Sequence, residues 1–365
     1  MRAFGGKITV IMAPTPTNRS GAPSNPGKEM ETIAVTGATG FVGRYVVRAL
    51  VERGFAVRAL VRSREKAKEH LPGSGSGPGG GPGGGVKLVV GDVLDSACVQ
   101  DLVGGCAGAI HLVGIIREER DAGGGKSVTF KKSHVEATRT VVAACAAAGV
   151  QRYIHMSALG ASPNGVSEYQ RTKFDAENLV RFSTLHWTIF RPGLIHGPDG
   201  DFVQMIAAIL RGKAAPYLFA PYFTRGVEDK RVVLGGVTRH DPFVQPVAVE
   251  DVANAFVSAL TNPEALGEVY NLVGAETLDW PTMLRFMCEA MGAEKMEPWG
   301  IPSEPAAVAA MIAGKIGLGG LLPFDAGMAR MGAQDSTASL DKFRSDFRFD
   351  PRPFRPAFKT YAASL

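Results

Sequence analysis

The sequence is poor in cysteine, in net charge and in long apolar runs. Its four cysteines contain no Cys-x-x-Cys pair, so neither a zinc site nor a disulfide framework is predicted, and a reducing compartment is expected. No stretch reaches the ~18 uninterrupted apolar residues that suggest a membrane span. The nearest approach, residues 306–324, is broken by Lys315 and several glycines. We therefore predict a cytoplasmic protein without a transmembrane segment.

The formal net charge is only +5, and more than half of it falls in residues 1–30, which hold four basic residues and one acidic residue. Residues 31–365 are nearly neutral, so the sequence does not predict a basic surface that would bind nucleic acid. Residues 1–30 are rich in Pro, Ser, Thr and Asn and are predicted to be a disordered tail. Residues 73–85 read GSGSGPGGGPGGG, which predicts a flexible surface loop.

From residue 31 onward, apolar β-branched runs alternate with segments of helical periodicity. Such alternation, with strands apolar on both faces, predicts an α/β fold in which helices cover both sides of a doubly wound parallel sheet. The expected strands are Ile33–Thr36, Phe55–Val61, Val86–Val90, Ala109–Ile116, Tyr153–Ser157 and Trp187–Arg191.

The alternation loosens near residue 200. We predict a Rossmann domain over residues 31–200 and a smaller C-terminal substrate lobe over residues 201–365 that completes the same unit. The lobe is expected to contain the helices Phe202–Arg211, Val249–Thr261 and Pro281–Met291 and the strand Val269–Val273. Residues 306–324 are predicted to form a helix packed on this lobe. The alternative is an apolar patch for a peripheral membrane or protein contact.

A glycine-rich turn follows the first expected strand and opens the first helix. Gly37 lets the chain turn, Gly40 leaves the backbone open to a pyrophosphate, and Gly43 lets helix and strand pack closely. The strand–turn–helix context favours a dinucleotide site over a merely structural turn. The turn as a whole is predicted to bind the cofactor, and it also contains the residues Thr39, Phe41 and Val42.

Arg62 directly follows the second strand, at the point where an NAD site usually places a carboxylate for the ribose hydroxyl. A guanidinium there can bind a 2′-phosphate through paired hydrogen bonds. We therefore predict a preference for NADP(H) and leave NAD(H) open, the alternative being that Arg62 is simply a solvated residue. Asp92 and Val93, which follow the third strand, are predicted to lie at the adenine, although a strand-end turn would also use Asp.

Tyr169 and Lys173 form a Tyr-x-x-x-Lys pattern on an expected helix, so they share one face. A neighbouring ammonium is expected to lower the pKa of the tyrosine, which can then exchange a proton with a substrate oxygen. Lys173 could also hold the nicotinamide ribose. Ser157, at the end of the fifth strand, could orient the substrate oxygen or could be a polar strand cap. We predict Ser157, Tyr169 and Lys173 as the catalytic residues and predict no metal site.

These motifs together resemble the short-chain dehydrogenase/reductase superfamily. Longer segments resemble its atypical, epimerase/dehydratase-like branch, which includes the NADPH-binding accessory subunit of respiratory complex I and its bacterial relatives. The segments are VTGATGFVGRYVVRAL, HLVGII, HMSALGA, EYQRTKFDAE, TIFRPGLIHGP and QPVAVEDVANAF. The resemblance spans residues 31–355. It implies that the cofactor also lies along the residues Leu112, Val113, Gly114, Pro192, Leu194 and Ile195.

The sequence departs from the family pattern at His134, which stands where extended members commonly carry an asparagine. A histidine there could relay protons, but a histidine satisfied by hydrogen bonds is the favoured interpretation. His111 is expected to be a packed residue. Residues 73–85 and part of 217–236 look like insertions.

Two functions remain. The first is an NAD(P)-dependent oxidoreductase or epimerase acting on an unidentified small carbonyl or hydroxyl substrate, supported by Ser157, Tyr169 and Lys173. The second is a non-catalytic NADPH-binding accessory, assembly or sensor protein, supported by the resemblance and by His134. The retained triad favours enzyme activity.

Overall fold

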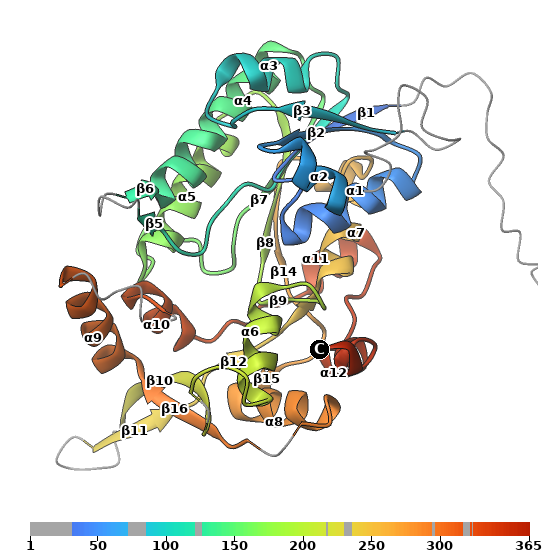
Figure 1. Cartoon of the computed structure of the whole chain (residues 1–365). Helices are drawn as coiled ribbons and strands as arrows, with labels where there is room; N and C mark the ends of the chain where they lie inside the picture. Colours follow the sequence, from blue (N-terminus) through green and yellow to red (C-terminus); the bar gives the residue numbers. More distant parts are fainter. Residues whose placement is uncertain are drawn as a thin grey trace, which may run out of the picture.

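The structure is a computed structural model (Figure 1), and it describes residues 31–71, 85–120, 126–216, 218–229, 236–293, 296–316, 322 and 324–365. The predicted tail 1–30 and all but the last residue of the glycine-rich loop 73–85 lie outside the described residues.

Seven parallel strands form the central sheet, in the order β14-β8-β7-β4-β1-β2-β3. Strand order reverses between β1 and β4, the point at which open α/β sheets bind ligands. The predicted Rossmann-type parallel sheet is confirmed. The strands are β1 (Thr32–Thr36), β2 (Ala56–Val61), β3 (Val86–Val90), β4 (Gly108–His111), β7 (Arg152–Met156), β8 (His186–Pro192) and β14 (Glu268–Leu272).

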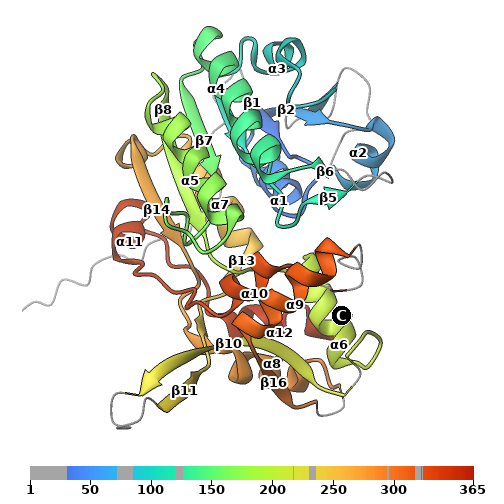
Figure 2. The same ribbon diagram turned by 90° about the vertical axis from the view of Figure 1, so that its left-hand side faces the viewer.

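Helices cover both faces of this sheet, as Figures 1 and 2 show. One face is covered by α1 (Phe41–Glu52), α2 (Arg64–His70), α7 (Val249–Ala259) and α11 (Asp341–Phe347), whose apolar side chains share a core with β1 and β2. The other face is covered by α3 (Ser96–Val103), the π-helix η1 (Lys131–Glu136), α4 (Ala137–Ala147) and α5 (Glu168–Arg181).

Three expectations need correction. The fourth strand ends at His111 instead of Ile116, because the chain leaves the sheet there to line a cavity. The segments corresponding to α7 and β14 were expected in the smaller lobe. The structure instead packs α7 on α1 and pairs β14 with β8. Residues 201–365 therefore contribute to both the Rossmann domain and the smaller lobe. The sequence could not show this, because the periodicity of a segment indicates whether it is a helix or a strand but not which element it packs against.

The smaller lobe lies below the carboxyl ends of the strands (Figure 1) and has its own apolar cluster. Its helices are α6 (Asp201–Leu210), α8 (Trp280–Ala290), α9 (Ser303–Lys315), α10 (Ala326–Gly332) and α12 (Phe354–Lys359). Its strands are β10 (Ala220–Asp229), β11 (Gly236–His240) and β16 (Pro298–Pro302). The remaining elements of the described residues are short: β5 (Glu119–Arg120), β6 (Lys126–Val128), β9 (Ile195–His196), β12 (Phe243–Val244), β13 (Val247–Ala248), β15 (Leu278–Asp279), η2 (Pro263–Ala265) and η4 (Ala362–Ser364).

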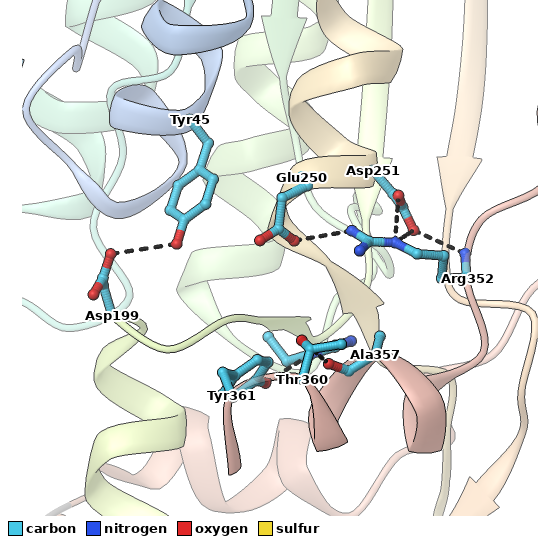
Figure 3. Close-up of polar contacts among 9 residues, drawn as sticks. Tyr45, Asp199, Glu250, Asp251, Arg352, Ala357, Thr360 and Tyr361 are labelled. Atoms are coloured by element: carbon cyan, nitrogen blue, oxygen red, sulfur yellow. Dashed lines mark hydrogen bonds and ion pairs between the residues drawn. The ribbon is translucent and has the colours of Figure 1, made fainter. Parts of the chain in front are cut away.

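The C-terminal segment is tied to the start of α7 by an ion-pair cluster (Figure 3). Both the backbone N–H and the Nε of Arg352 donate to the carboxylate of Asp251, at 2.8 and 3.0 Å, and Asp251 is 3% exposed. Arg352 also donates to Glu250 at 3.0 Å. Nearby, the Tyr45 hydroxyl on α1 donates to Asp199 at 3.3 Å. Side chains from α1, α7 and the last residues therefore meet at one junction between the two parts.

Candidate functional site

The turn between β1 and α1 has the geometry expected of a pyrophosphate site. Gly37 adopts a φ of +73°, which side chains rarely tolerate, and its carbonyl accepts a 3.1 Å hydrogen bond from the Gly40 N–H. Within the described structure, no side chain caps the start of α1, and its first turn carries no acidic residue. The N–H groups at this helix start are therefore oriented to bind an anion.

Gly43 lies where α1 passes closest to the turn. A methyl group at this position would overlap the carbonyl oxygen of Gly37 and would lie 2.7 Å from that of Ala38. The third glycine of the motif is therefore needed for close packing of helix and turn, as predicted.

A cavity of about 1500 Å³ opens beside this turn. It brings together most of the predicted cofactor and catalytic residues: Gly37, Gly40, Phe41, Val42, Gly43, Leu112, Gly114, Ser157, Tyr169, Lys173, Pro192, Leu194 and Ile195. The other predicted residues, Thr39, Arg62, Asp92, Val93 and Val113, do not line it. Its walls also include side chains from α9 and α10, which no sequence motif had indicated.

Arg62 and Asp92 follow two neighbouring strands, because Val61 of β2 is in register with Val90 of β3. Arg62 is exposed. One carboxylate oxygen of Asp92 accepts a 2.8 Å hydrogen bond from the Leu94 N–H, which is the strand-end turn considered as the alternative for this residue. Their roles toward the cofactor stay predictions.

Tyr169 and Lys173 both lie on α5 and face the cavity. The ring of Tyr169 packs edge-on against Phe130 and His134, with centroids 5.9 and 5.4 Å apart. This burial raises the pKa of Tyr169 to about 12. The expectation that Lys173 would lower the pKa of Tyr169 is not met, since the shift is upward and burial is its cause.

Lys173 is 3% exposed, and its Nζ donates to the carbonyl oxygen of Met156 at the end of β7, at 3.0 Å. Burial lowers the pKa of Lys173 to about 8, against the opposing influence of Glu177. The ammonium is thus held at the carboxyl end of the sheet by the backbone, next to Gly114.

The Ser157 hydroxyl donates to Glu177 at 2.6 Å. Glu177 is fully buried and also accepts bonds from Arg191 at 2.6 and 2.7 Å and from Arg181 at 2.9 Å. The geometry thus favours the structural alternative considered for Ser157, since its hydroxyl is committed to a buried carboxylate. Sequence reasoning missed Glu177, although its spacing of four residues from Lys173 places both on one helix face.

His134 lies in the π-helix η1, a distortion that is common at functional sites. Its Nδ1 lies 2.9 Å from the Thr172 hydroxyl, and its Nε2 lies 3.1–3.2 Å from the backbone of Ile115. Burial, and secondly the charge of Lys173, lower the pKa of His134 to about 2. The interpretation of His134 as a hydrogen-bonded histidine is confirmed.

His111 is also a packed residue, as predicted, since its ring nitrogens lie 2.6 and 3.2 Å from the hydroxyls of Thr36 and Thr138. His155 stacks on it with centroids 5.5 Å apart, and neither of its ring nitrogens has a hydrogen-bond partner in the described part of the chain. Across the described residues, no group of three or more His, Cys, Asp or Glu side chains could hold a metal ion.

Comparison with known proteins agrees with this geometry. Residues 37–209 match the model of a family described as NAD(P)H-binding. The matched segment contains the glycine turn, Tyr169 and Lys173. Over 250 residues it is 26% identical to a mitochondrial NADH dehydrogenase [ubiquinone] 1 alpha subcomplex subunit 9 from Dictyostelium discoideum, covering 68% of this chain and 61% of that protein. Over 264 residues it is 28% identical to a ceramide reductase from Caulobacter vibrioides, covering 72% and 71%.

Solved structures support the same fold. A short-chain dehydrogenase/reductase superfamily protein from Agrobacterium tumefaciens with bound NAD superposes with a TM-score of 0.60 at 21% identity, covering 92% of this chain and 96% of that one. The chain spans about three fifths of the length of the NADH dehydrogenase subunit from Dictyostelium. Among the described helices, none combines the length and apolar character needed to cross a membrane.

Proposed function

We propose that the chain is an NADP(H)-dependent oxidoreductase that reduces a carbonyl group, with Tyr169 as the proton donor and Lys173 as the residue that holds the nicotinamide ribose. The observation that carries this proposal is that one cavity contains the glycine turn, Tyr169 and Lys173. NADPH would supply a hydride to the carbonyl carbon while Tyr169 gives its phenolic proton to the oxygen, which yields an alcohol and NADP⁺.

The raised pKa of Tyr169 is consistent with the reductive direction. A phenol with a pKa near 12 carries its proton at neutral pH and can donate it to an oxygen that gains negative charge. A protonated Tyr169 can therefore act as the proton donor in this direction.

The test compares Tyr169→Phe with Lys173→Ala. Tyr169→Phe should abolish NADPH oxidation with a panel of aldehydes and ketones while leaving NADPH affinity within about twofold, because only the proton is removed. Lys173→Ala should reduce both turnover and affinity. Turnover that is unchanged in Tyr169→Phe would remove Tyr169 from the mechanism.

We also propose that the cofactor is NADPH, because Arg62 stands where a carboxylate would otherwise bind the ribose. Arg64 and Lys66 follow within one helical turn and add positive charge. Arg62→Asp should weaken NADPH binding by at least about tenfold and spare NADH, in line with the loss of a paired charged hydrogen bond. Equal affinities of the unchanged protein for the two nucleotides would contradict this assignment.

A second candidate function is a non-catalytic NADPH-binding accessory or assembly role. It is favoured by the similarity to proteins named as NADH dehydrogenase subunits and by exposed apolar side chains on α9. In this alternative, residues 306–324 make a peripheral protein or membrane contact in the cytoplasm, and NADPH is retained without turnover. This role would be favoured if the purified protein carries NADPH and none of the carbonyl compounds in the panel causes its oxidation.

A further inference from the structure

The cavity has more volume than the nicotinamide end of the cofactor and a small carbonyl substrate would occupy. Its volume of about 1500 Å³ exceeds the roughly 300–1,000 Å³ of ordinary ligand pockets. The half beside the glycine turn would take the nicotinamide end of the cofactor. The other half is walled by α9 and α10 of the smaller lobe, which Figure 2 shows in front of the sheet's lower edge.

This second half begins directly beside the reacting residues. Ser167 caps α5 two residues before Tyr169, and its hydroxyl contacts the sulfur of Met331 on α10 at 3.0 Å. Gly327 of α10 lies against the same serine, so closely that a methyl group there would lie 3.2 Å from the Ser167 Cβ. In turn, α9 packs on α10 through small buried alanines. The wall formed by the two helices therefore continues from Tyr169 outward.

The apolar lining residues away from the glycine turn include Ile116, Phe130, Phe202, Met311, Phe324 and Met331. Lys315 of α9 and Asp325 at the start of α10 also line this wall. Among the described residues around the whole cavity, three basic side chains face four acidic ones. Beyond the N–H groups of the glycine turn, the cavity therefore offers no excess of basic side chains to a second diphosphate.

The apolar lining continues onto the surface. Met311 lines the cavity and is 48% exposed. Val308, Ile312 and Ile316 are spaced four residues apart, so they form a row on one side of α9 next to Met311. Their side chains are between 43% and 63% exposed. Side chains of this kind usually gather where a partner or ligand covers them. Here the row starts at the mouth of the reaction cavity.

We propose that the substrate is a single-chain amphiphile, a carbonyl compound whose hydrocarbon tail of about ten or more carbons lies along α10 and leaves the cavity past Met311 and Ile312. The proposal rests on the proposed reduction at Tyr169, where the carbonyl accepts a hydride from NADPH and a proton from Tyr169 to become an alcohol. The tail fills the apolar half of the cavity and covers the exposed row of α9.

Two measurements on the full chain test the proposal. The first is the rate of NADPH oxidation with straight-chain aldehydes from four to twelve carbons. Each buried methylene is worth up to about fourfold in binding, so kcat/KM should rise at least ~30-fold across the series. The second is binding of 11-(dansylamino)undecanoic acid, followed by its fluorescence, which needs no turnover.

The variants are Met311→Asp and the milder Met311→Gln, with Phe182→Gln as the matched control. Phe182 is an exposed apolar residue at the end of α5 and does not line the cavity. Met311→Asp should weaken probe binding at least tenfold, Met311→Gln should weaken it less, and Phe182→Gln should not change it. Thermal unfolding of each variant verifies that it is folded.

The outcomes separate the two proposals. Probe binding that depends on Met311, without oxidation of NADPH by any aldehyde, would support the apolar-tail site and reject the proposed function. Turnover with kcat/KM independent of chain length would support the function and overturn the tail site. Probe binding that is equal in all variants, or displacement of the probe by UDP-glucose, would also overturn it.

Discussion

Gly114 and Lys173 approach each other so closely that a methyl group on Gly114 would lie 2.8 Å from the Lys173 Nζ and 3.5 Å from the His134 Nε2. The backbone after β4 therefore passes directly over the ammonium that we assign to the nicotinamide ribose. Any side chain at residue 114 has to displace Lys173 from its hydrogen bond to Met156.

Gly114→Ala should therefore leave the protein folded, because the end of a lysine side chain can move, but it should impair the site. We expect at least about tenfold weaker NADPH binding and a larger loss of turnover, in line with the loss of one charge-assisted contact of about 1.5–3 kcal/mol. Titration with NADPH and thermal unfolding measure the two effects. As a control, Gly104→Ala in the turn after α3 lies away from the cavity and should leave NADPH affinity and turnover unchanged. Normal NADPH affinity in Gly114→Ala would show that Lys173 does not contact the cofactor.

Ser157 and Glu177 lead to a different prediction. Ser157→Ala removes one of four hydrogen bonds to a buried carboxylate, which should cost about 1–3 kcal/mol of stability. Because the hydroxyl points to Glu177, NADPH affinity should stay unchanged and turnover should fall by less than about tenfold. Urea unfolding and steady-state kinetics test this. A stable variant with abolished turnover would restore Ser157 as the residue that orients the substrate.

The buried histidines predict a loss of stability in mild acid. Burial lowers the pKa of His134 to about 2 and those of His111 and His196 to about 3, and it holds the pKa of His155 well below its usual value. The unfolded chain takes up these protons near pH 6.5, and the folded chain does not. The free energy of unfolding should therefore fall as the pH drops below about 6.5, by up to about 1.4 kcal/mol per pH unit for each histidine.

Urea unfolding at pH 7.5, 6.5 and 5.5 measures this slope. His155→Phe keeps a stacked ring and removes two nitrogens that have no hydrogen-bond partner. The variant should take up one proton fewer on unfolding, so its free energy of unfolding should depend less steeply on pH. His70→Gln, at the exposed end of α2, is the control and should leave the slope unchanged. Stability that is constant between pH 7.5 and 5.5 would mean that these imidazoles become protonated in the folded protein.

The pair Asp251–Arg352 in Figure 3 should be important for stability. Arg352→Leu leaves a buried carboxylate without its main partner, at a cost of about 3–5 kcal/mol. Even with Arg352 present, burial holds the pKa of Asp251 above its ordinary value. Arg344→Ala, which breaks an exposed pair with Asp350, should cost less than about 1 kcal/mol. Similar losses in the two variants, measured by urea unfolding, would contradict the distinction.

The strands of the sheet could be predicted from sequence to within a few residues, because parallel strands are apolar on both faces and end at glycines. Val86–Val90 was predicted at its observed bounds. The end of β4 was missed, because Leu112 and Ile115 are as apolar as the strand before them, although they line a cavity. The return of β14 to the sheet could not be predicted, because strand pairing depends on partners that lie far apart in sequence.

In the site, the turn at Gly37 and the pair Tyr169–Lys173 could be predicted from sequence because their spacing fixes a local geometry. The surroundings that set the pKa values of these side chains could not be predicted. The edge-on packing of Phe130 on Tyr169 comes from a separate element and reverses the expected direction of the tyrosine pKa. Likewise, no motif indicated that α9 and α10 wall the cavity, since α10 contacts the start of α5 through Ser167 and Met331 and α9 packs on α10.

The pairing of β14 with β8 also bears on how the chain is made. Until β14 has left the ribosome, β8 is an open edge of an apolar sheet, which invites pairing with other chains. The end of β14 follows the end of β8 by roughly 80 residues, which take on the order of 4–16 s to synthesise. During that interval the nucleotide-binding half is incomplete. A nascent chain truncated before β14 should therefore aggregate rather than fold as a smaller Rossmann protein.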